Sequence, residues 1–110
     1  MAKKTPINIY TEITPNPLVM KFVMDKIISN DVVEFKSLEE AKKCPLAIEL
    51  FNFPFIKEIF IAKNYISICK YNVIEWEEVA NDIRDFLRKY MQEKKPIFIT
   101  PSIKKEKVIR

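Results

Sequence analysis

Apolar and polar residues alternate along two stretches near the start of the chain. The first stretch has apolar residues at Ile7, Ile9 and Ile13, with mainly polar residues between them. The second covers residues 18–24 and resumes the alternation after Thr14-Pro15-Asn16-Pro17. A period of two predicts half-buried β-structure. Because a proline lacks the N–H donor of a strand ladder, we expect one strand to kink or to cross a sheet edge at 14–17.

Three further runs have the composition of strands. Residues 32–35 follow a connection at 25–31, and residues 56–62 and 65–71 are rich in β-branched and aromatic side chains. Only Lys63 and Asn64 separate the last two runs, which predicts a tight hairpin. Such a turn favours a residue that tolerates positive φ, so we expect Asn64 to take the left-handed conformation in place of a glycine.

Helical signals occur in three places. Ser37 and Glu40 have the spacing of a capping box, which predicts a short helix to about residue 43. Pro45 suits the first turn of a second short helix, and Asn72 with Glu75 predicts the start of a longer one. The longer helix, about 18 residues, has the strongest periodicity in the chain. Its apolar residues recur at intervals of three and four: Trp76, Val79, Ala80, Ile83, Phe86, Leu87, Tyr90 and Met91.

The order strand, strand, helix, strand, strand, helix predicts an α+β fold. Strands joined by hairpins pair antiparallel, so we expect an antiparallel four-stranded sheet in ββαββα order with the helices packed on one face. Residues 1–91 should form this single domain. Residues 92–110 are rich in lysine and include a short β-like patch at 97–99. We predict that they form a basic linker or mobile C-terminal tail.

Two residue types are missing from the chain, and each absence excludes classes of enzyme. The 110 residues include no glycine, which excludes P-loops, dinucleotide-binding turns and nucleophile elbows, because these need backbone that bulkier residues cannot provide. They include no histidine, which excludes Ser-His and Cys-His pairs and imidazole metal sites. The adjacent carboxylates at 39–40 and 77–78 point in different directions on a helix, so they do not form an acid–base pair. We therefore expect a protein that is not an enzyme.

The two cysteines are isolated in the sequence. Cys44 and Cys69 do not have the close spacing of zinc or iron–sulfur ligands. We expect both to be small apolar residues, buried or half-buried, and we expect no bound metal or cofactor. The alternative is a cluster bridged between two copies of the chain, with two thiolates from each.

The charge and hydropathy of the chain bear on its partners. Lys and Arg total 19 against 15 Asp and Glu, a net charge of +4, but the cations are mostly scattered lysines. Proteins that bind phosphates usually concentrate their charge and favour arginine, so this pattern counts against nucleic acid as a partner. The first residues resemble neither a signal peptide nor a presequence, and the apolar runs are too short to span a membrane. We expect a cytoplasmic protein.

Several segments, taken in order, resemble the N-terminal domain of Nfu/NifU-like iron–sulfur cluster scaffold proteins. Residues 11–22 are similar to the family's TExTPNPxxxKF opening, and residues 45–51 to its SPLAxxLF helix. Residues 56–61 and 64–68 are similar to its GVKSVFF and DFITV strands, and residues 75–78 to its DWEEL helix start. The resemblance covers about residues 9–91. The chain departs from the family at Cys44, where a serine is usual, and at Phe55, where a glycine is usual.

The resemblance implies a non-catalytic accessory or targeting module of iron–sulfur cluster assembly that lacks the CxxC domain which binds the cluster. Its partners would be iron–sulfur assembly or recipient proteins, or a C-terminal CxxC NifU-like domain. The chain would be either a fragment of a longer scaffold or a stand-alone domain. The candidate partner-contact residues are Thr14, Pro15, Asn16, Pro17 and Lys21.

Each functional interpretation has an alternative. A structural kink is the alternative role for residues 14–17. Trp76 and Tyr90 could line a binding groove, but their helical spacing favours the core. For the whole chain, the alternative function is a small basic nucleic-acid-binding α+β module that uses aromatic residues on an open sheet face.

Overall fold

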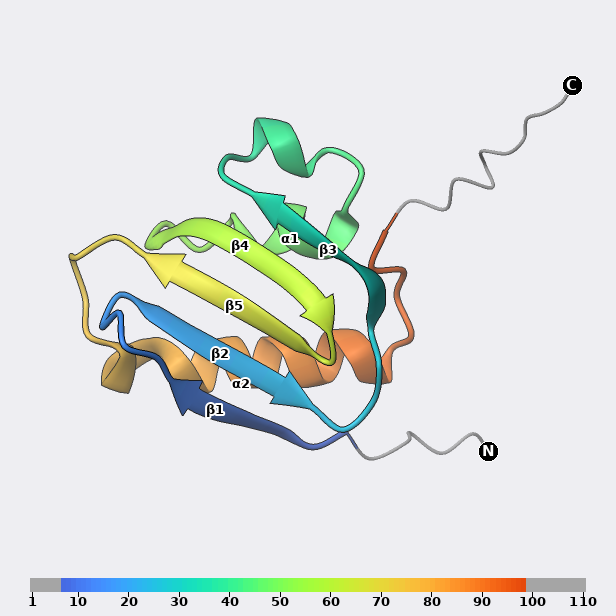
Figure 1. Ribbon diagram of the computed structural model, residues 1–110, viewed down its shortest axis with the longest axis horizontal. Coiled ribbons are helices and arrows are strands. Elements are labelled where there is room, and N and C mark those ends of the chain that lie inside the picture. Colours follow the sequence, from blue (N-terminus) through green and yellow to red (C-terminus); the bar gives the residue numbers. More distant parts are fainter. Residues whose placement is uncertain (1–6, 99–110) are drawn as a thin grey trace, which may run out of the picture.

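Five strands and two α-helices make up residues 7–98, the part of the chain that this computed structural model describes. In chain order the elements are β1 (Ile9–Ile13), β2 (Val19–Met24), β3 (Ser29–Phe35), the 3₁₀ turn η1 (Glu39–Ala41), α1 (Pro45–Leu50), β4 (Ile56–Lys63), β5 (Tyr65–Lys70) and α2 (Trp76–Gln92). The strands form an antiparallel sheet of order β1-β2-β5-β4-β3. Figure 1 shows both α-helices behind this sheet. The predicted α+β class with helices on one face is confirmed.

The sheet has five strands where four were predicted, because the proline-containing segment reverses the chain. Ile13 at the end of β1 pairs with Met20 in β2, directly across the turn. Inside the turn, the Asn16 carbonyl accepts the Val19 N–H at 3.0 Å, and Asn16 Oδ1 accepts the Leu18 N–H at 2.9 Å. Residues 14–17 therefore form the turn of a β1–β2 hairpin, and the expected kink within one strand is wrong.

The β4–β5 hairpin lies where it was predicted, but a different residue has the strained conformation. Lys63, and not Asn64, has the positive φ, at 49°. Asn64 connects the hairpin to β2: its Nδ2 donates to the Met24 carbonyl at 3.0 Å, and its own carbonyl accepts the Met24 N–H at 2.7 Å. These long-range bonds fix Asn64 in a way that local turn preferences do not anticipate.

Two of the three predicted helix starts differ from the structure. Ser37 Oγ accepts the Glu40 N–H at 3.3 Å, yet the segment forms only the 3₁₀ turn η1 and no helix to residue 43. α2 begins at Trp76 with Glu75 as its N-cap, so the predicted cap at Asn72 is wrong. α1 begins at Pro45, as expected.

An apolar core lies between the sheet and the helices. Its fully buried side chains come from both layers, among them Phe22, Leu46, Leu50, Ile59, Ile66, Ile83 and Leu87. Trp76 and Tyr90 are only 8% and 2% exposed, which confirms that they are core residues. Cys44 is buried and Cys69 is half-buried, and both are free thiols. The expectation of two small structural cysteines is therefore confirmed.

After α2 the chain returns to the helix layer. Ile97 and Phe98 pack against the core, and the Ile97 carbonyl accepts the Leu46 N–H at 3.5 Å. These two residues form a bend, so the β-like patch predicted at 97–99 is not a strand at these positions. The rest of the predicted tail, 99–110, lies outside the described residues. Within residues 7–98, no helix has both the length and the apolar composition to cross a bilayer.

Candidate functional site

A pocket of about 320 Å³ lies where the β1–β2 turn meets the first turn of α2. From the hairpin, Ile13, Thr14, Asn16 and Pro17 line it, together with Val19 and Met20 of β2. From the start of the helix, Glu75, Trp76 and Glu77 line it. We call this hollow the Trp76 pocket. Figure 1 shows the β1–β2 turn and the beginning of α2 at the left-hand end of the sheet.

The polar side chains of the turn are used to hold the turn itself. Thr14 Oγ1 lies 2.9 Å and 3.1 Å from the carbonyl oxygens of Asn16 and Val19, and it accepts the Asn16 N–H at 3.2 Å. With the bond from Leu18 to Asn16 Oδ1, these contacts fix the backbone of the turn. The wall of the pocket is therefore formed before any partner binds. Pro15 is exposed and does not line the pocket.

Ile13 is an apolar residue on the helix side of the sheet that remains uncovered by the described residues. Met20, its partner across the hairpin, is buried in the core, and so is Ile9 on the same side of β1. Ile13 is nevertheless 85% exposed at the end of this edge strand, and it lines the Trp76 pocket. An exposed apolar side chain that lines a hollow is a feature of protein-binding surfaces.

Trp76 is the single tryptophan of the chain, and its indole is held by other aromatic rings. Phe22 and Phe55 make edge-on contacts with it, at centroid distances of 5.9 Å and 6.3 Å. The indole Nε1 is buried and has no hydrogen-bond partner among the described residues. A buried donor without an acceptor costs about 1–3 kcal/mol, and native proteins have few of them. The residue that lines the pocket is therefore rigidly placed and has an unsatisfied polar atom.

The charged groups at the pocket are carboxylates. Glu75 and Glu77 line it, both exposed, and the lining residues include no lysine or arginine. Glu77 and Glu78 also lie in the first turn of α2, where negative charge complements the positive end of the helix dipole. Because this end of the helix is already compensated, the pocket disfavours an anion. It favours an apolar group with a cation nearby.

Lys21 lies away from the Trp76 pocket, on the open face of the sheet. Its Nζ is 3.9 Å from a carboxylate oxygen of Glu12 and 4.1 Å from the centroid of the Tyr65 ring. The Phe60 ring stacks with that of Tyr65, with the two centroids 6.2 Å apart. The structure therefore does not bring Lys21 together with residues 14–17.

The open face has the aromatic residues but not the charge of a nucleic-acid-binding sheet. Paired residues of neighbouring strands point to the same side, so Glu12, Lys21, Phe60 and Glu34 share one row across the open face. Glu58 joins the same face through its pairing with Cys69. Among these residues three are carboxylates and one is an ammonium, so they do not favour phosphate binding or the nucleic-acid alternative.

The two thiols lie on different sides of the sheet. Cys44 belongs to the core on the helix side, whereas Cys69 pairs with Val19 and Glu58 on the open face. Burial raises the pKa of the Cys44 thiol, and burial followed by the Glu58 charge raises the pKa of the Cys69 thiol. Within residues 7–98, no group of three or more His, Cys, Asp or Glu side chains is arranged to hold a metal ion.

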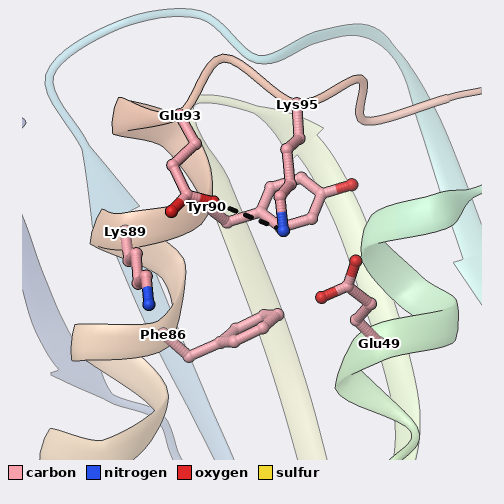
Figure 2. Close-up of a pocket in the computed structure, with 6 residues that line it drawn as sticks. All are labelled: Glu49, Phe86, Lys89, Tyr90, Glu93 and Lys95. Carbon is pink, nitrogen blue, oxygen red and sulfur yellow. Dashed lines mark ion pairs between the residues drawn. The ribbon is translucent and has the colours of Figure 1, made fainter.

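A second pocket, of about 250 Å³, lies between α1 and α2. Figure 2 shows Glu49, Phe86 and Lys95 pointing into it around the ring of Tyr90. The Tyr90 hydroxyl donates to the Pro96 carbonyl at 2.6 Å. Burial, and then the charge of Glu49, raises the pKa of Tyr90 to about 12, so the hydroxyl remains a donor at neutral pH. We interpret this pocket as the place where the segment after α2 is fastened to the helices.

The predicted contact residues and the observed site overlap in part. Thr14, Asn16 and Pro17 line the Trp76 pocket, Pro15 is exposed beside it, and Lys21 is elsewhere. Sequence reasoning missed Ile13 as a site residue and preferred a core role for Trp76 over a binding groove, because both continue apolar periodicities that predict the core. It missed Glu75 because the helix was expected to begin earlier.

Comparison with known proteins gives a consistent result. A family model described as "Scaffold protein Nfu/NifU N terminal" matches residues 9–94. The human protein named "NFU1 iron-sulfur cluster scaffold homolog, mitochondrial" is 31% identical over 77 residues, which cover 68% of this chain and 30% of that protein. The protein of the same name from Drosophila willistoni is 33% identical over 92 residues, 78% of this chain and 32% of that protein. The chain thus spans about a third of the length of these curated relatives.

Two solved structures have the same fold. A NifU-like protein from Saccharomyces cerevisiae superimposes with a TM-score of 0.75 at 21% identity, over 89% of each chain. Protein SAV1430 from Staphylococcus aureus superimposes with a TM-score of 0.59 at 20% identity, over 72% of this chain and 96% of its own. At these identities the likeness concerns the fold alone.

Proposed function

The chain belongs to the Nfu/NifU N-terminal family, and from that membership we propose that it is a non-catalytic accessory module of iron–sulfur cluster assembly. In this role it recognises an assembly or recipient protein, while a CxxC domain, linked to it or separate, holds the cluster. The observation that carries the proposal is the family match over residues 9–94. Recognition is assigned to the Trp76 pocket and to the β1–β2 turn that forms its wall.

The positions of the cysteines support a module that does not hold the cluster itself. A [4Fe–4S] cluster ordinarily takes four thiolates, and this chain has two, on different sides of its sheet. Two copies would have to present both a core thiol and an open-face thiol at one interface. The lack of histidine and glycine supports a non-catalytic role, because it excludes Ser-His and Cys-His pairs and glycine-dependent catalytic loops.

The candidate residues have different parts in this proposal. Thr14 and Asn16 hold the turn, Pro17 contributes to the pocket wall, and Pro15 extends the exposed surface beside it. Lys21 would make a separate contact from the open face, where Glu12 and the Tyr65 ring now position its ammonium. A partner that used both would have to reach around the edge strand β1.

A reconstitution experiment tests the first half of the proposal. The chain is incubated anaerobically with iron and sulfide and then desalted. We expect no persistent absorbance near about 400 nm, since the ligand set for a cluster is incomplete. Stoichiometric retention of a cluster, lost in a Cys44→Ser, Cys69→Ser double variant, would contradict the accessory role and make the chain a carrier.

A transfer experiment tests the second half. The chain is joined through its C-terminus to a cluster-loaded CxxC domain, and delivery is followed as recovered activity of an apo-[4Fe–4S] enzyme. The joined protein should deliver faster than the CxxC domain alone. Equal rates would contradict a targeting role.

Two further expectations belong to this proposal. We propose a cytoplasmic location, although the matched curated relatives are mitochondrial by name, and fractionation of cells that express the protein is the test. We also propose that nucleic acid is not a partner. An electrophoretic shift that persists at about 200 mM salt would contradict this, because weak phosphate binding is lost there.

A further inference from the structure

The Trp76 pocket lies at an end of the sheet where the fold leaves apolar surface uncovered. Ile13 is on the side of the sheet that the helices cover, in register with the buried Met20, but 85% of it faces solvent. Pro17, Val19 and Met20 continue the apolar lining of the pocket next to it. An apolar side chain from another molecule would bury Ile13, as the core of this chain buries Ile9.

The strand that leads to the pocket is also free to pair. β1 is at one end of the sheet order and pairs only with β2 among the described strands. An edge strand presents unpaired N–H and C=O groups, to which an extended segment can add. A segment on β1 would place alternate side chains on the helix side, in line with Ile9 and Ile13, and so beside the pocket.

The charge around the pocket selects among such segments. Glu75 and Glu77 line it and Glu78 follows, whereas its lining has no cation to pair with a partner's carboxylate. Opposite charge at the rim of an interface favours encounter and excludes like-charged partners. The complementary segment therefore has lysine or arginine next to its apolar residues.

We infer that the Trp76 pocket receives an apolar side chain from an extended, lysine- or arginine-flanked segment of a protein partner, which adds to the free edge of β1. The inference rests on the proposed function in one respect, that the occupant is a protein. It adds the conformation of the bound segment, its charge, and the pocket that binds its apolar side chain.

Two short synthetic peptides are the probes that test this inference. One has Val-Ile-Val at its centre and lysines at both ends, and the other has glutamates in place of the lysines. Each is titrated into the ¹⁵N-labelled chain, and binding is followed at the indole N–H of Trp76 and at the backbone amides. We expect the basic peptide to shift the indole signal and the amides of residues 9–17, and to bind at least about tenfold more tightly than the acidic one.

Matched variants locate the binding. Ile13→Asp should weaken the basic peptide at least about tenfold with an unchanged melting temperature, because the side chain it replaces is mostly exposed. Val32→Asp is its control: Val32 is also β-branched, lies in the other edge strand β3 and is 65% exposed, and its replacement should leave affinity unchanged. Glu77→Gln should weaken binding more than Glu78→Gln, since Glu77 lines the pocket and both changes remove one charge.

Three results would overturn the inference. They are equal affinities for the two peptides, shifts that map to β3 or the open face, and an indole signal that does not move at millimolar peptide. The transfer experiment separates this outcome from failure of the proposed function. If the basic peptide binds as described while the joined protein delivers no faster than the CxxC domain alone, the proposed function fails and the docking inference stands. The reverse pattern removes the inference and leaves the function.

Discussion

Replacing Trp76 by alanine is the sharpest test of how the last helix is anchored to the sheet. The indole is only 8% exposed and contacts Phe22 of β2 and Phe55 of the turn before β4, so it links three parts of the fold. It also leads α2, whose apolar stripe continues to Met91. Removing the ring therefore takes away packing that no neighbouring side chain can replace without moving the helix.

The expected cost follows from two opposing contributions. Deleting a core aromatic ring usually costs about 3–5 kcal/mol, including the cavity that remains. The alanine variant also removes the unpaired Nε1–H, which recovers about 1 kcal/mol of its desolvation penalty. We therefore expect a net loss of about 3 kcal/mol, near the lower end of the aromatic range. In a domain of this size that lowers the melting temperature by more than about 12 °C.

A phenylalanine variant separates the two contributions. Trp76→Phe keeps an aromatic ring between Phe22 and Phe55 but has no donor, so it should cost about 1 kcal/mol or less. Unfolding in urea is followed by far-ultraviolet circular dichroism, since both variants lose the only tryptophan. Val73→Ala, at an exposed position, is the control and should remain within about 0.5 kcal/mol of the parent. An unchanged midpoint for Trp76→Ala, or equal losses for the two Trp76 variants, would refute this reasoning.

Four further predictions concern other positions. Tyr90→Phe should cost about 1 kcal/mol in urea, because it removes the hydrogen bond to the Pro96 carbonyl. The raised pKa of Tyr90, about 12 against 10.0, means that only the unfolded state ionises between these values, so stability should fall over this pH range more steeply in the parent than in Tyr90→Phe. Lys70→Met should change the free energy of unfolding in urea by no more than about 1 kcal/mol, because the Lys70 side chain is 2% exposed, methionine can keep its apolar packing, and none of the ion pairs among the described residues includes it. Cys44→Ser should change the free energy of unfolding in urea by less than about 1 kcal/mol, since Cys44 is the N-cap of α1 and serine is favoured at that position. A larger loss would show that the apolar character of the thiol contributes more than the cap.

Periodicity predicted the parts of the fold in which one face of a regular element is buried. The apolar residues of α2 from Trp76 to Met91 recur at helical intervals, and six of them are buried in the structure. The hairpin of β4 and β5 could also be predicted from the sequence, because β-branched and aromatic residues lie on either side of a short connection. In these segments, local propensity and tertiary burial favour the same structure.

The errors occur where a local signal has more than one tertiary outcome. Two prolines interrupt an alternation both when a strand bends and when it reverses, and the Ile13–Met20 pairing decides between them. β3 begins at Ser29, and the prediction placed its start at Val32. A register shift between Ser29 and Val33 interrupts the alternation there, so the pattern did not indicate the first part of the strand. The Asn72 capping signal competes with the connection from β5, and the helix begins only at Trp76. Each case needs a long-range contact that the sequence does not display.

The start of α2 also bears on the candidate site. The helix begins at Trp76 and not after Asn72, so residues 73–75, about 4.5 Å of helix, are loop, and Glu75 lines the pocket beside Trp76 and Glu77. Alternation assigned Ile13 to the helix side of the sheet, opposite the buried Met20. Yet β1 is an edge strand in which only Ile9 is buried, and Thr11 and Ile13 on the same side are both exposed. A period of two therefore gives the side of the sheet on which a residue lies, but whether that side is core or surface depends on how far the helix layer reaches along an edge strand, which the sequence does not display.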